Sequence, residues 1–425
     1  MTPFVDPDLG KPADQLFGER LTRLTAALKL KQPDRIPIVL GAGYLLADMY
    51  GVTRQEQHEN GETEIQMLLK AAQHFQPDTI FGAFNNPASS IAIGTDVMVK
   101  FPGHGLDPNG SFQFVEGEYM KPEDYDAFID DPADWAIRKY WPRVFPELAG
   151  FGMLPPLGMA AFGTYNLYNL GVLQAPPVVH AFQMLMKAAE AQAKSDARTM
   201  ETTQRLAAAG FAPPPLAGAL IEAPFDAMSD TLRGMRGIML DIHRRPEKLL
   251  AAMEKVLKYE LEHALAFCNA TGLKTAFIPL HRGSDGFMSL AQFEKFYWPT
   301  LKTMQETLVE NGIMPFVFYE GVWDQRLKYL AELPKGKTAG WFQFSDIFKV
   351  KEVVGETMAI TGGMRNSMLQ AGTVEEVRAF TKRLCEEVGK GGGFLMSVGV
   401  GEMEGCRPEL VKAWIEATKE YGVYA

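Results

Sequence analysis

The sequence predicts an α/β fold in which parallel strands alternate with helices and close into a barrel. Two observations lead to this prediction. A short apolar run followed by an amphipathic stretch recurs about seven or eight times along the chain, which is typical of a (β/α) barrel. These apolar runs also end on polar side chains, and the carboxyl ends of parallel strands are where α/β folds bind ligands. A doubly wound sheet is the competing architecture.

The segment Lys274–Asp324 shows the arrangement most clearly. Its first apolar run, Thr275–Leu280, has the length of a buried strand, and Ser289 is placed to cap the amphipathic helix that follows. A second apolar run, Ile313–Phe318, completes a strand-helix-strand unit. Both strands lead into side chains that can do chemistry: His281, Arg282 and Asp285 after the first, and Tyr319, Glu320 and Asp324 after the second.

The other elements are predicted from the same patterns. Further strands are expected at Ile36–Leu40, Thr79–Phe81, Leu216–Ile221, Gly340–Phe344, Met358–Thr361 and Phe394–Val398. Further helices are expected at residues 21–30, 62–73, 176–209, 231–241, 246–267, 373–389 and 408–421. Alternating residues predict a β-hairpin inserted at 97–120, and residues 123–150 are expected to form a surface connection with one short helix. No linker or repeat divides the sequence, so we expect one domain over 1–425, with an N-terminal arm and helix at 1–32.

Composition excludes several classes of function. The formal net charge is −10, the pI is about 5.4 and no basic run is present, which argues against binding to nucleic acid or to an anionic membrane. The opening residues MTPFVDPDLGKPADQ are unlike a signal or transit peptide, and no apolar run approaches the roughly 20 residues that span a bilayer. Three widely spaced cysteines do not indicate a disulfide framework. We therefore expect a soluble cytoplasmic protein.

Five stretches resemble the uroporphyrinogen decarboxylase superfamily, in family order from Pro33 to the end of the chain. They are PDRIPIVL, GIMLDIHRRPEKLLAAMEKV, SLAQFEKFYWPTLKTMQETL, GTVEEVRAFTKRLCEEVGKGGGFLMSVG and RPELVKAWIEATKEYG. The resemblance implies a distorted TIM (β/α)8 barrel with its active site at the carboxyl ends of the strands, and it suggests a homodimer. It also implies one of two activities: decarboxylation of a tetrapyrrole, or methyl transfer to or from a corrinoid or a thiol.

The decarboxylase branch of the family fits the sequence poorly. Those enzymes carry an arginine-rich loop after the first strand, which holds substrate carboxylates, whereas the loop here is GAGYLLADMYG and has no basic residue. They also carry an aspartate after the second strand, where this chain has AFNN. Asn85 or Asn86 could accept hydrogen bonds there but supplies no charge.

The methyltransferase branch fits better, except at the metal. Its zinc enzymes bind the ion through a His-x-Cys pair after the sixth strand and a later cysteine. The matching stretches here are PFVFYEGVWD and SVGVGE, with Val400 near the place of the later cysteine, so we do not predict the family's zinc site. A metal held by His281, Glu320 or Glu402 stays open.

The resemblance also implies cobalamin as the cofactor. Asp241-Ile242-His243 begins like a corrinoid-binding motif, but Pro246 stands where glycine is needed. We expect the corrinoid to arrive on a partner protein or as a free cofactor.

Three side chains are predicted to be catalytic. His281 and Glu320 end neighbouring strands and could act as acid-base groups, and Glu222 ends the preceding strand. The structural alternative for His281 is a core histidine bonded to a backbone carbonyl, and for Glu320 it is a solvated loop residue. For Glu222 it is a helix cap or a partner for Arg282. Substrate-binding groups are predicted at strand ends and in an aromatic-walled pocket: Arg282, Arg365, Asn85, Asn86, Tyr44, Tyr165, Tyr319, Asp285, Asp324 and Glu402. Ordinary core packing and neutralisation of nearby charges are the alternatives for these.

Taken with the resemblance, these residues predict a methyltransferase or demethylase. It would move a methyl group between a small methylated substrate and the corrinoid of a partner protein. An aromatic compound is one class of substrate that this prediction includes. A decarboxylase or lyase acting on a non-porphyrin acid held by Arg282 or Arg365 is the alternative enzyme, and a corrinoid-binding scaffold is the non-enzymatic one. Polar residues at four or more separate strand ends speak against the scaffold.

Overall fold

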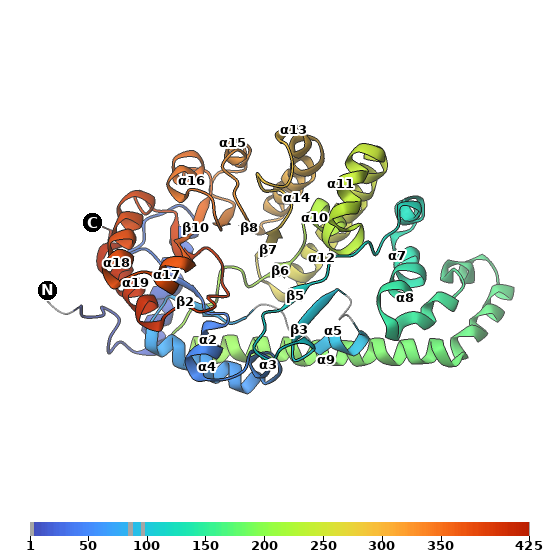
Figure 1. Ribbon diagram of the computed structural model, residues 1–425, viewed down its shortest axis with the longest axis horizontal. Helices are drawn as coiled ribbons and strands as arrows, with labels where there is room; N and C mark the ends of the chain where they lie inside the picture. The colour runs from blue at the N-terminus through green and yellow to red at the C-terminus, as the bar shows by residue number, and fades with distance from the viewer. Residues whose placement is uncertain (1–3, 84–87, 95–97, 425) are drawn as a thin grey trace.

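The computed structural model describes residues 4–83, 88–94 and 98–424, with the side chains of residues 164–166 outside the description. Eight parallel strands form the framework (Figure 1). They are β1 (Val39–Gly41), β2 (Thr79–Phe81), β6 (Ala219–Leu220), β7 (Thr275–Leu280), β8 (Met314–Tyr319), β9 (Ala339–Phe342), β10 (Ala359–Met364) and β11 (Phe394–Val398). The predicted α/β fold with a parallel sheet is therefore confirmed.

The strands form an arc rather than a closed ring. Six of them pair in the order β11-β10-β9-β8-β7-β6, β1 pairs with β2, and a parallel bridge between Ile38 and Met396 joins the two sheets. In the described part of the chain, no pairing joins β2 to β6. The Ala212 N–H donates to the Asp78 carbonyl at 3.1 Å, which ties the chain before β6 to the start of β2. The barrel thus has the eight expected strands but lacks the seam that would close it.

Helices cover the outer face of the arc (Figure 1). In chain order the α-helices are α1 (Ala13–Leu28), α2 (Leu45–Tyr50), α3 (Arg54–Glu59), α4 (Gly61–Phe75), α5 (Ala88–Ile93), α6 (Tyr125–Asp130), α7 (Pro132–Trp135), α8 (Trp141–Val144), α9 (Pro176–Ala208), α10 (Pro224–Ala227), α11 (Gly234–Arg244), α12 (Pro246–Thr271), α13 (Leu290–Gln292), α14 (Trp298–Glu310), α15 (Leu327–Leu330), α16 (Ile347–Val354), α17 (Asn366–Ala371), α18 (Val374–Arg383) and α19 (Pro408–Tyr421). Tighter or wider helical turns are η2 (Pro122–Asp124), η3 (Ala136–Tyr140), η4 (Pro146–Met153), η5 (Leu157–Phe162), η6 (Thr164–Gln174), η7 (Met228–Leu232), η8 (Phe293–Tyr297) and η9 (Leu384–Val388).

Side chains alternate strictly between two cores along the central strands. On β8, Phe316 and Phe318 belong to the cluster inside the barrel, whereas Val317 and Tyr319 pack against the outer helices. The neighbouring strand follows the same rule, and Leu280 of β7 is in register with Tyr319. Successive residues of a strand point to opposite faces of the sheet. The residue after Leu280 and the residue after Tyr319 therefore both face into the barrel. The sequence therefore directs the next side chain of both strands into the barrel.

A buried ionic cluster closes the amino-terminal end of the barrel. Asp78, which is fully buried, accepts hydrogen bonds from Arg23 of α1, from both terminal nitrogens of Arg35 (2.7 and 3.0 Å) and from the Ile38 N–H (2.7 Å). Burial alone would raise the pKa of Asp78, but the two arginines hold it below its usual value. This carboxylate joins α1 and β1 to the start of β2.

Four sequence predictions about elements need correction. The first helix begins at Ala13 rather than at residue 21, because Leu16 and the buried guanidiniums of Arg20 and Arg23 extend its inward face. The third strand is reduced to Ala219–Leu220, since only these residues pair with β7. Residues 123–150 form several helical turns instead of one short helix. The ring is open where a closed barrel was expected.

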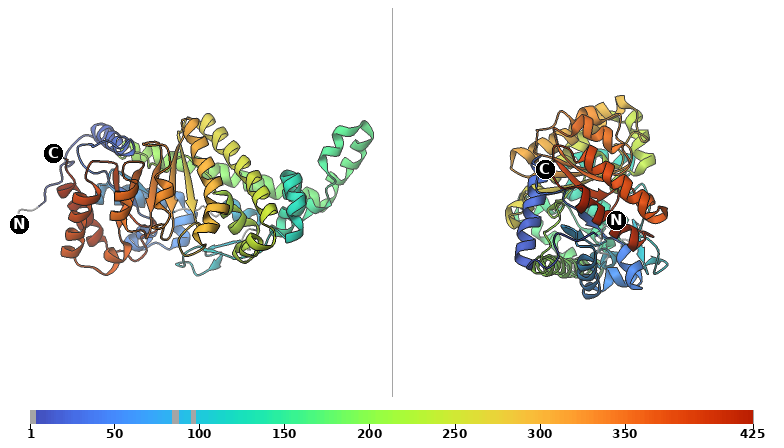
Figure 2. Two further views of the ribbon diagram at one scale, coloured as in Figure 1. Left: turned by 90° about the horizontal axis from the view of Figure 1, so that it is seen from above. Right: turned by 90° about the vertical axis from the view of Figure 1, so that its left-hand side faces the viewer.

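Two insertions extend the barrel. The expected hairpin is present as β3 (Val99–Pro102), β4 (Gly105–Leu106) and β5 (Gln113–Phe114), with β3 and β5 antiparallel. The second insertion is an arm that projects away from the body, formed by residues 146–175 and the first turns of α9 (Figure 2). Among the described residues, no helix has the length and apolar character that crossing a membrane requires.

Replacing Asp78 by Asn should destabilise the fold strongly, because Arg23 and Arg35 lose the fully buried carboxylate that they share, and Arg23 keeps only the exposed Asp34. We expect a loss of about 3–5 kcal/mol of unfolding free energy in urea titrations followed by circular dichroism. Asp34 is the matched control, since it also binds Arg23 but its side chain is 64% exposed. Asp34→Asn should cost about 0–1 kcal/mol. Equal losses for the two variants would contradict the role given to Asp78.

Candidate active site

His281 and Glu320 meet at the carboxyl ends of β7 and β8. Each follows the last residue of its strand, so both side chains continue the inward series described above. The His281 Nε2 lies 3.8 Å from Glu320 Oε2, and both side chains remain partly exposed. Burial raises the pKa of Glu320, which keeps its proton available at a higher pH than that of a solvated glutamate. The structure therefore brings together two of the three predicted catalytic residues.

Asp230, on η7, orients His281. Its carboxylate is bonded to His281 Nδ1 and also accepts from Arg282 Nε at 3.0 Å and from the Ser229 hydroxyl at 2.9 Å. Burial lowers the pKa of His281, but the bond to Asp230 and the charges of Asp226, Asp230 and Glu320 outweigh it and raise the pKa to about 9. The imidazole is thus protonated at neutral pH, with Nδ1 facing Asp230 and Nε2 facing Glu320.

Asp226, on α10, fixes the backbone of the same strand end. Its carboxylate is 0% exposed and accepts hydrogen bonds from the His281 N–H (3.0 Å), the Arg282 N–H (2.9 Å) and the Tyr297 hydroxyl. Sequence reasoning missed both Asp226 and Asp230 as site residues. The available signal was their spacing: they stand four residues apart in the helical segment that follows β6, which places both on one side of a helical turn.

Glu222 adds a further acid on the neighbouring strand end. It follows Ile221, which packs outward, so its side chain faces inward like Leu220. Its backbone N–H donates to Glu260 Oε2 of α12 at 3.3 Å. Burial, reinforced by the negative charges of Asp230 and Glu260, raises the pKa of Glu222 to about 7. Glu222 therefore changes protonation state in the neutral range.

Glu402 approaches the same place from β11. Its carbonyl accepts from the Tyr44 N–H at 2.7 Å, and Gly43 has a φ of +38° with a virtual Cβ 2.4 Å from the Glu402 backbone. Only glycine permits this close approach of the loops after β1 and β11. Burial, followed by the charge of Glu320, raises the pKa of Glu402, and its Oε2 has no hydrogen-bond partner among the described residues. Glu402 is thus one of the predicted binding residues that lie near Glu320.

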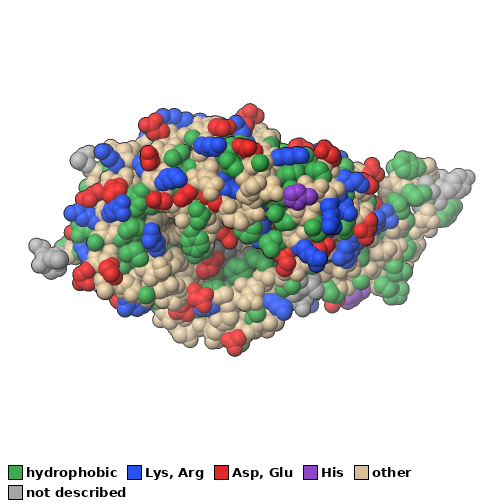
Figure 3. Space-filling model, turned by 45° about the horizontal axis from the view of Figure 1, so that its top comes forward, with side chains coloured by type: hydrophobic (Ala, Val, Ile, Leu, Met, Phe, Trp, Pro, Cys, Tyr) green, Lys and Arg blue, Asp and Glu red, His purple; other side chains and the backbone are tan. Residues whose placement is uncertain are grey.

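Aromatic side chains form the layer inside the barrel below these acids. The rings of Phe318 and Trp341 lie 4.8 Å apart, and Phe81 contacts Trp341 edge to face at 6.2 Å. A hydrogen bond of 2.8 Å from Trp341 Nε1 to the Val398 carbonyl fixes the indole. Figure 3 shows a hollow near the middle of the molecule with acidic and hydrophobic side chains around it. Charged strand ends over an apolar aromatic layer are the composition expected of a small-molecule site.

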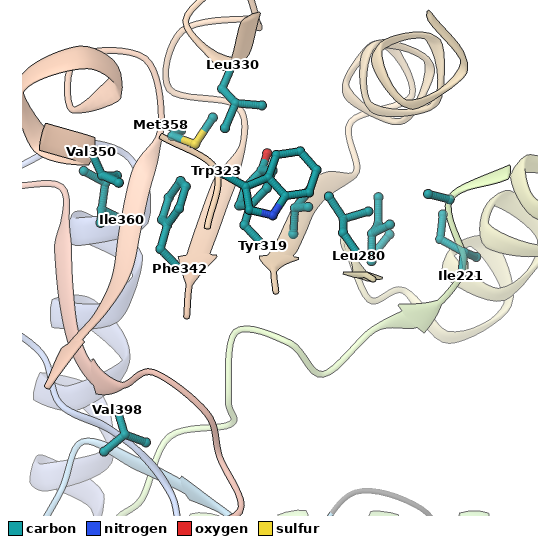
Figure 4. Packing of buried hydrophobic residues seen from close by; sticks show 14 of the residues in the cluster. Ile221, Leu280, Tyr319, Trp323, Leu330, Phe342, Val350, Met358, Ile360 and Val398 are labelled. Atoms are coloured by element: carbon teal, nitrogen blue, oxygen red, sulfur yellow. The ribbon is translucent and has the colours of Figure 1, made fainter. Parts of the chain in front are cut away.

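Two predicted binding residues, Tyr319 and Tyr44, are buried among other side chains. Tyr319 is fully buried on the helix-facing side of β8, stacked on Phe342 and beside Trp323 (Figure 4). Tyr44 is buried under the hairpin, where its hydroxyl bonds His58 Nε2 at 3.0 Å and the Arg54 guanidinium covers its ring. Tyr319 faces outward because successive residues of a strand point to opposite faces, and Glu320, the next residue, faces inward.

Three charged residues are also occupied elsewhere. Asp285 binds the buried guanidinium of Arg326 and the Gln325 N–H, so it holds its own loop. Asp324 accepts from the Asp346 N–H at 3.2 Å and joins the loops after β8 and β9. Arg365 lies over the ring of Phe380 on the outer helix α18. The structure thus gives all three side chains partners within the protein, and their contact with substrate stays a prediction.

The remaining predictions are mixed. Arg282 lies at the site, with its charge held by Asp230 and with Glu116 at 3.9 Å. Asn85 and Asn86 lie outside the described residues. Tyr165 belongs to η6 in the projecting arm, and its side chain is likewise outside the described part.

The donor set does not match a thiolate zinc centre. Cys268, Cys385 and Cys406 are all buried, on α12, on η9 and in the loop before α19, and burial raises the pKa of both Cys385 and Cys406 to about 12. Within the described residues, no group of three or more His, Cys, Asp or Glu side chains is arranged to hold a metal ion.

Replacing Asp230 by Asn should lower the pKa of His281 from about 9 toward the ordinary value near 6.5, because the charge-assisted bond to Nδ1 is lost. An NMR titration of the His281 ring proton, assigned by its absence in His281→Gln, measures this directly. Asp324→Asn is the control and should leave the titration unchanged. An Asp230→Asn variant with an unshifted His281 would contradict the assigned geometry.

Comparison with known proteins agrees with this fold. The chain is similar in structure to a methyltransferase from Methanosarcina mazei, with a TM-score of 0.59 and 17% sequence identity, over 95% of this chain and 98% of that one. No curated protein matches the chain significantly in sequence. The family described as uroporphyrinogen decarboxylase (URO-D) matches residues 172–421, which is more than half of the chain. The structure is thus a distorted TIM-type barrel, and the chain belongs to the uroporphyrinogen decarboxylase family.

Proposed function

We propose that this protein is a methyl-transfer enzyme that moves a methyl group between a small methylated substrate and a corrinoid carried by a partner protein. The observation that carries the proposal is the Asp230–His281–Glu320 arrangement at adjacent strand ends, above an aromatic layer. The fold-level likeness to a methyltransferase adds support. Removing a methyl group from an ether or an amine requires the methyl to be held in line, the leaving atom to be protonated and water to be excluded.

The His281 imidazolium is suited to the protonation step. Asp230 holds Nδ1, which leaves the Nε2 proton pointing toward Glu320 and the interior of the site. A leaving oxygen or nitrogen within reach of both side chains would take the proton from Nε2. Glu320 would stabilise the positive charge of the imidazolium before the transfer, or return a proton to the neutral ring after it. Glu222, with its pKa raised to about 7, is a second proton donor within the same group of side chains.

The chain's own residues fit a corrinoid at the mouth of this site. Leu220 is 61% exposed and Phe344 is 68% exposed, both at strand ends where large apolar side chains are normally covered. They suit contact with the flat, largely apolar face of a corrin ring. When bound, the corrinoid supplies the cobalt that accepts or donates the methyl group. The cysteine positions give no comparable support for zinc, so no step is assigned to that metal.

Decarboxylation of a non-porphyrin acid is less well supported. That reaction needs a free cation to hold the substrate carboxylate. Arg282 is already paired with Asp230, and Arg365 lies over Phe380 on the outer face. The surplus of carboxyl groups at the strand ends would also repel an anionic substrate.

Glu320→Gln and His281→Gln should each reduce turnover by about 10²- to 10⁴-fold while leaving the circular dichroism spectrum unchanged. The assay supplies free cob(I)alamin as methyl acceptor with a panel of phenyl methyl ethers and methylamines, and follows the visible spectrum of the corrinoid. Asp324→Asn, on the loop after the same strand, is the control and should retain full activity. Wild-type protein that transfers no methyl group, in the presence of either the free cofactor or a corrinoid protein, would sink the proposal.

The pH dependence of turnover should report Glu222. Because its pKa is raised to about 7, its acid form dominates below that pH and disappears above it. If Glu222 donates a proton, kcat falls as pH rises through about 7, and Glu222→Gln removes this limb. A second limb near pH 9, where His281 loses its proton, should persist in the Glu222 variant. An unchanged profile in Glu222→Gln would show that Glu222 is not a proton donor.

A further inference from the structure

Two buried acceptor oxygens beside Gly43 have no hydrogen-bond donor among the described residues. One is Glu402 Oε2. The other is Gln57 Oε1: Gln57 is 0% exposed, and its Nε2 donates to the Gly43 carbonyl at 3.0 Å, which leaves the amide oxygen without a donor. Both side chains adjoin Gly43, because the Glu402 backbone lies 2.4 Å from a virtual Cβ on that glycine. Buried acceptors are normally satisfied, so this pair fits a hydrogen-bond donor from outside the chain.

The turn after β10 adds a third acceptor of the same kind. Asn366 Nδ2 donates to the Val400 carbonyl at 3.2 Å, and this bond fixes which end of the amide faces that carbonyl. The Asn366 Oδ1 is buried and likewise has no donor in the described part of the chain. Val400 stands two residues before Glu402 on the loop after β11. Three adjoining segments thus each present a buried oxygen that can accept a hydrogen bond.

The basic side chains of these segments are engaged with other groups. Arg54 donates to Glu404 Oε1 at 2.7 Å, and Arg365 lies over an aromatic ring of the outer helix α18. The charge that acts on Glu402 is negative and comes from Glu320, and together with burial it raises the pKa of the Glu402 carboxyl. A cation placed beside Glu402 would offset this repulsion and stabilise the carboxylate.

The aromatic layer inside the barrel extends to the same loop. A virtual Cβ on Gly41 lies 2.7 Å from Phe81 Cζ and 2.8 Å from Gly401 Cα, so the Phe81 ring adjoins the backbone that precedes Glu402. Phe81 in turn contacts Trp341, and Val400 packs against the same inner cluster. Aromatic rings attract ammonium groups through their π-systems. Acceptor oxygens beside aromatic rings are the chemistry that recognises an amine in its protonated form.

We propose that Glu402 makes the site selective for substrates that carry a protonated amino group. This inference rests on the proposed function, in which His281 and Glu320 act on the methylated atom of the same molecule. The amino group is the part of the substrate that is recognised, and it is separate from the atom that loses the methyl group. A primary ammonium has three N–H donors and a positive charge, whereas a hydroxyl has one donor and no charge.

The test compares two ligands of nearly the same size and shape. para-Methoxybenzylamine is cationic at neutral pH, and para-methoxybenzyl alcohol is its neutral counterpart. Isothermal titration calorimetry with the full chain measures the affinity for each without requiring turnover. Wild type should bind the amine at least about tenfold more tightly than the alcohol, because the amine forms a charge-assisted hydrogen bond. Glu402→Gln should remove most of this preference while leaving the affinity for the alcohol unchanged.

Glu404→Gln is the matched control. Glu404 lies on the same loop, but its carboxylate is already bonded to Arg54 and, at 2.8 Å, to the Ser111 hydroxyl. This variant should keep the preference for the amine. Circular dichroism spectra of both variants, together with their affinity for the alcohol, show whether the site remains folded.

The same two ligands are then assayed for methyl transfer to free cob(I)alamin. Equal binding and equal turnover of the amine and the alcohol would overturn this inference and leave the proposed function standing. A preference that persists in Glu402→Gln, a preference lost equally in Glu404→Gln, or no binding of either ligand would also overturn it. Selective, Glu402-dependent binding of the amine without any methyl transfer would instead count against the proposed function, with Glu402 retained as an amine-binding residue.

Discussion

The geometry of the candidate site depends on one buried carboxylate, that of Asp226. It has no contact with solvent, and its oxygens are used by two consecutive backbone N–H groups, of His281 and Arg282, and by the Tyr297 hydroxyl. Three segments far apart in sequence are thereby held at one point: the turn after β6, the end of β7 and the helix before α14. A buried carboxylate without hydrogen-bond donors would cost stability, so the three donors hold Asp226 and the three segments in one arrangement. Asp230 lies one helical turn further on, so the same hydrogen bonds also fix its position relative to His281.

Electrostatics then divides similar residues into different roles. Asp230 lies against His281 and Arg282, which lower its pKa despite its burial, and so it remains an anion. Glu222, one strand away, is surrounded by other carboxyl groups, and its pKa rises to about 7. A fixed anion, a stable imidazolium and a titrating acid thus coexist in a small volume. Separation of pKa values within one cluster is a common feature of sites that move protons.

The sequence was sufficient for those features that depend on short-range pattern. Apolar runs of strand length located every strand of the arc, and the period of two correctly turned His281 and Glu320 into the barrel. The same rule, applied one residue earlier, places Tyr319 in the outer core, on the side of the strand opposite to Glu320. The internal partners of Asp285, Asp324 and Arg365 could not be predicted for another reason: Arg326, the Asp346 N–H and Phe380 become their neighbours only after folding. Asp226 could not be assigned its role from pattern alone, because its three donors come from the distant residues 281, 282 and 297.

Among the described residues no strand pairing joins β2 to β6, and this changes what kind of barrel the protein forms. In a closed barrel, strand number and stagger together fix the diameter, so every pore-facing position is coupled to every other. Here the circumference is set by hydrogen bonding on only seven of the eight sides. At the eighth, the Ala212 N–H donates to the Asp78 carbonyl at 3.1 Å, outside the strand register. His281 and Glu320 follow β7 and β8, which pair directly with each other over six residues, so their relative position does not depend on that side. The spacing of these two side chains is therefore set by the β7–β8 pairing, whereas the perimeter of the barrel can vary at the side where β2 and β6 are unpaired.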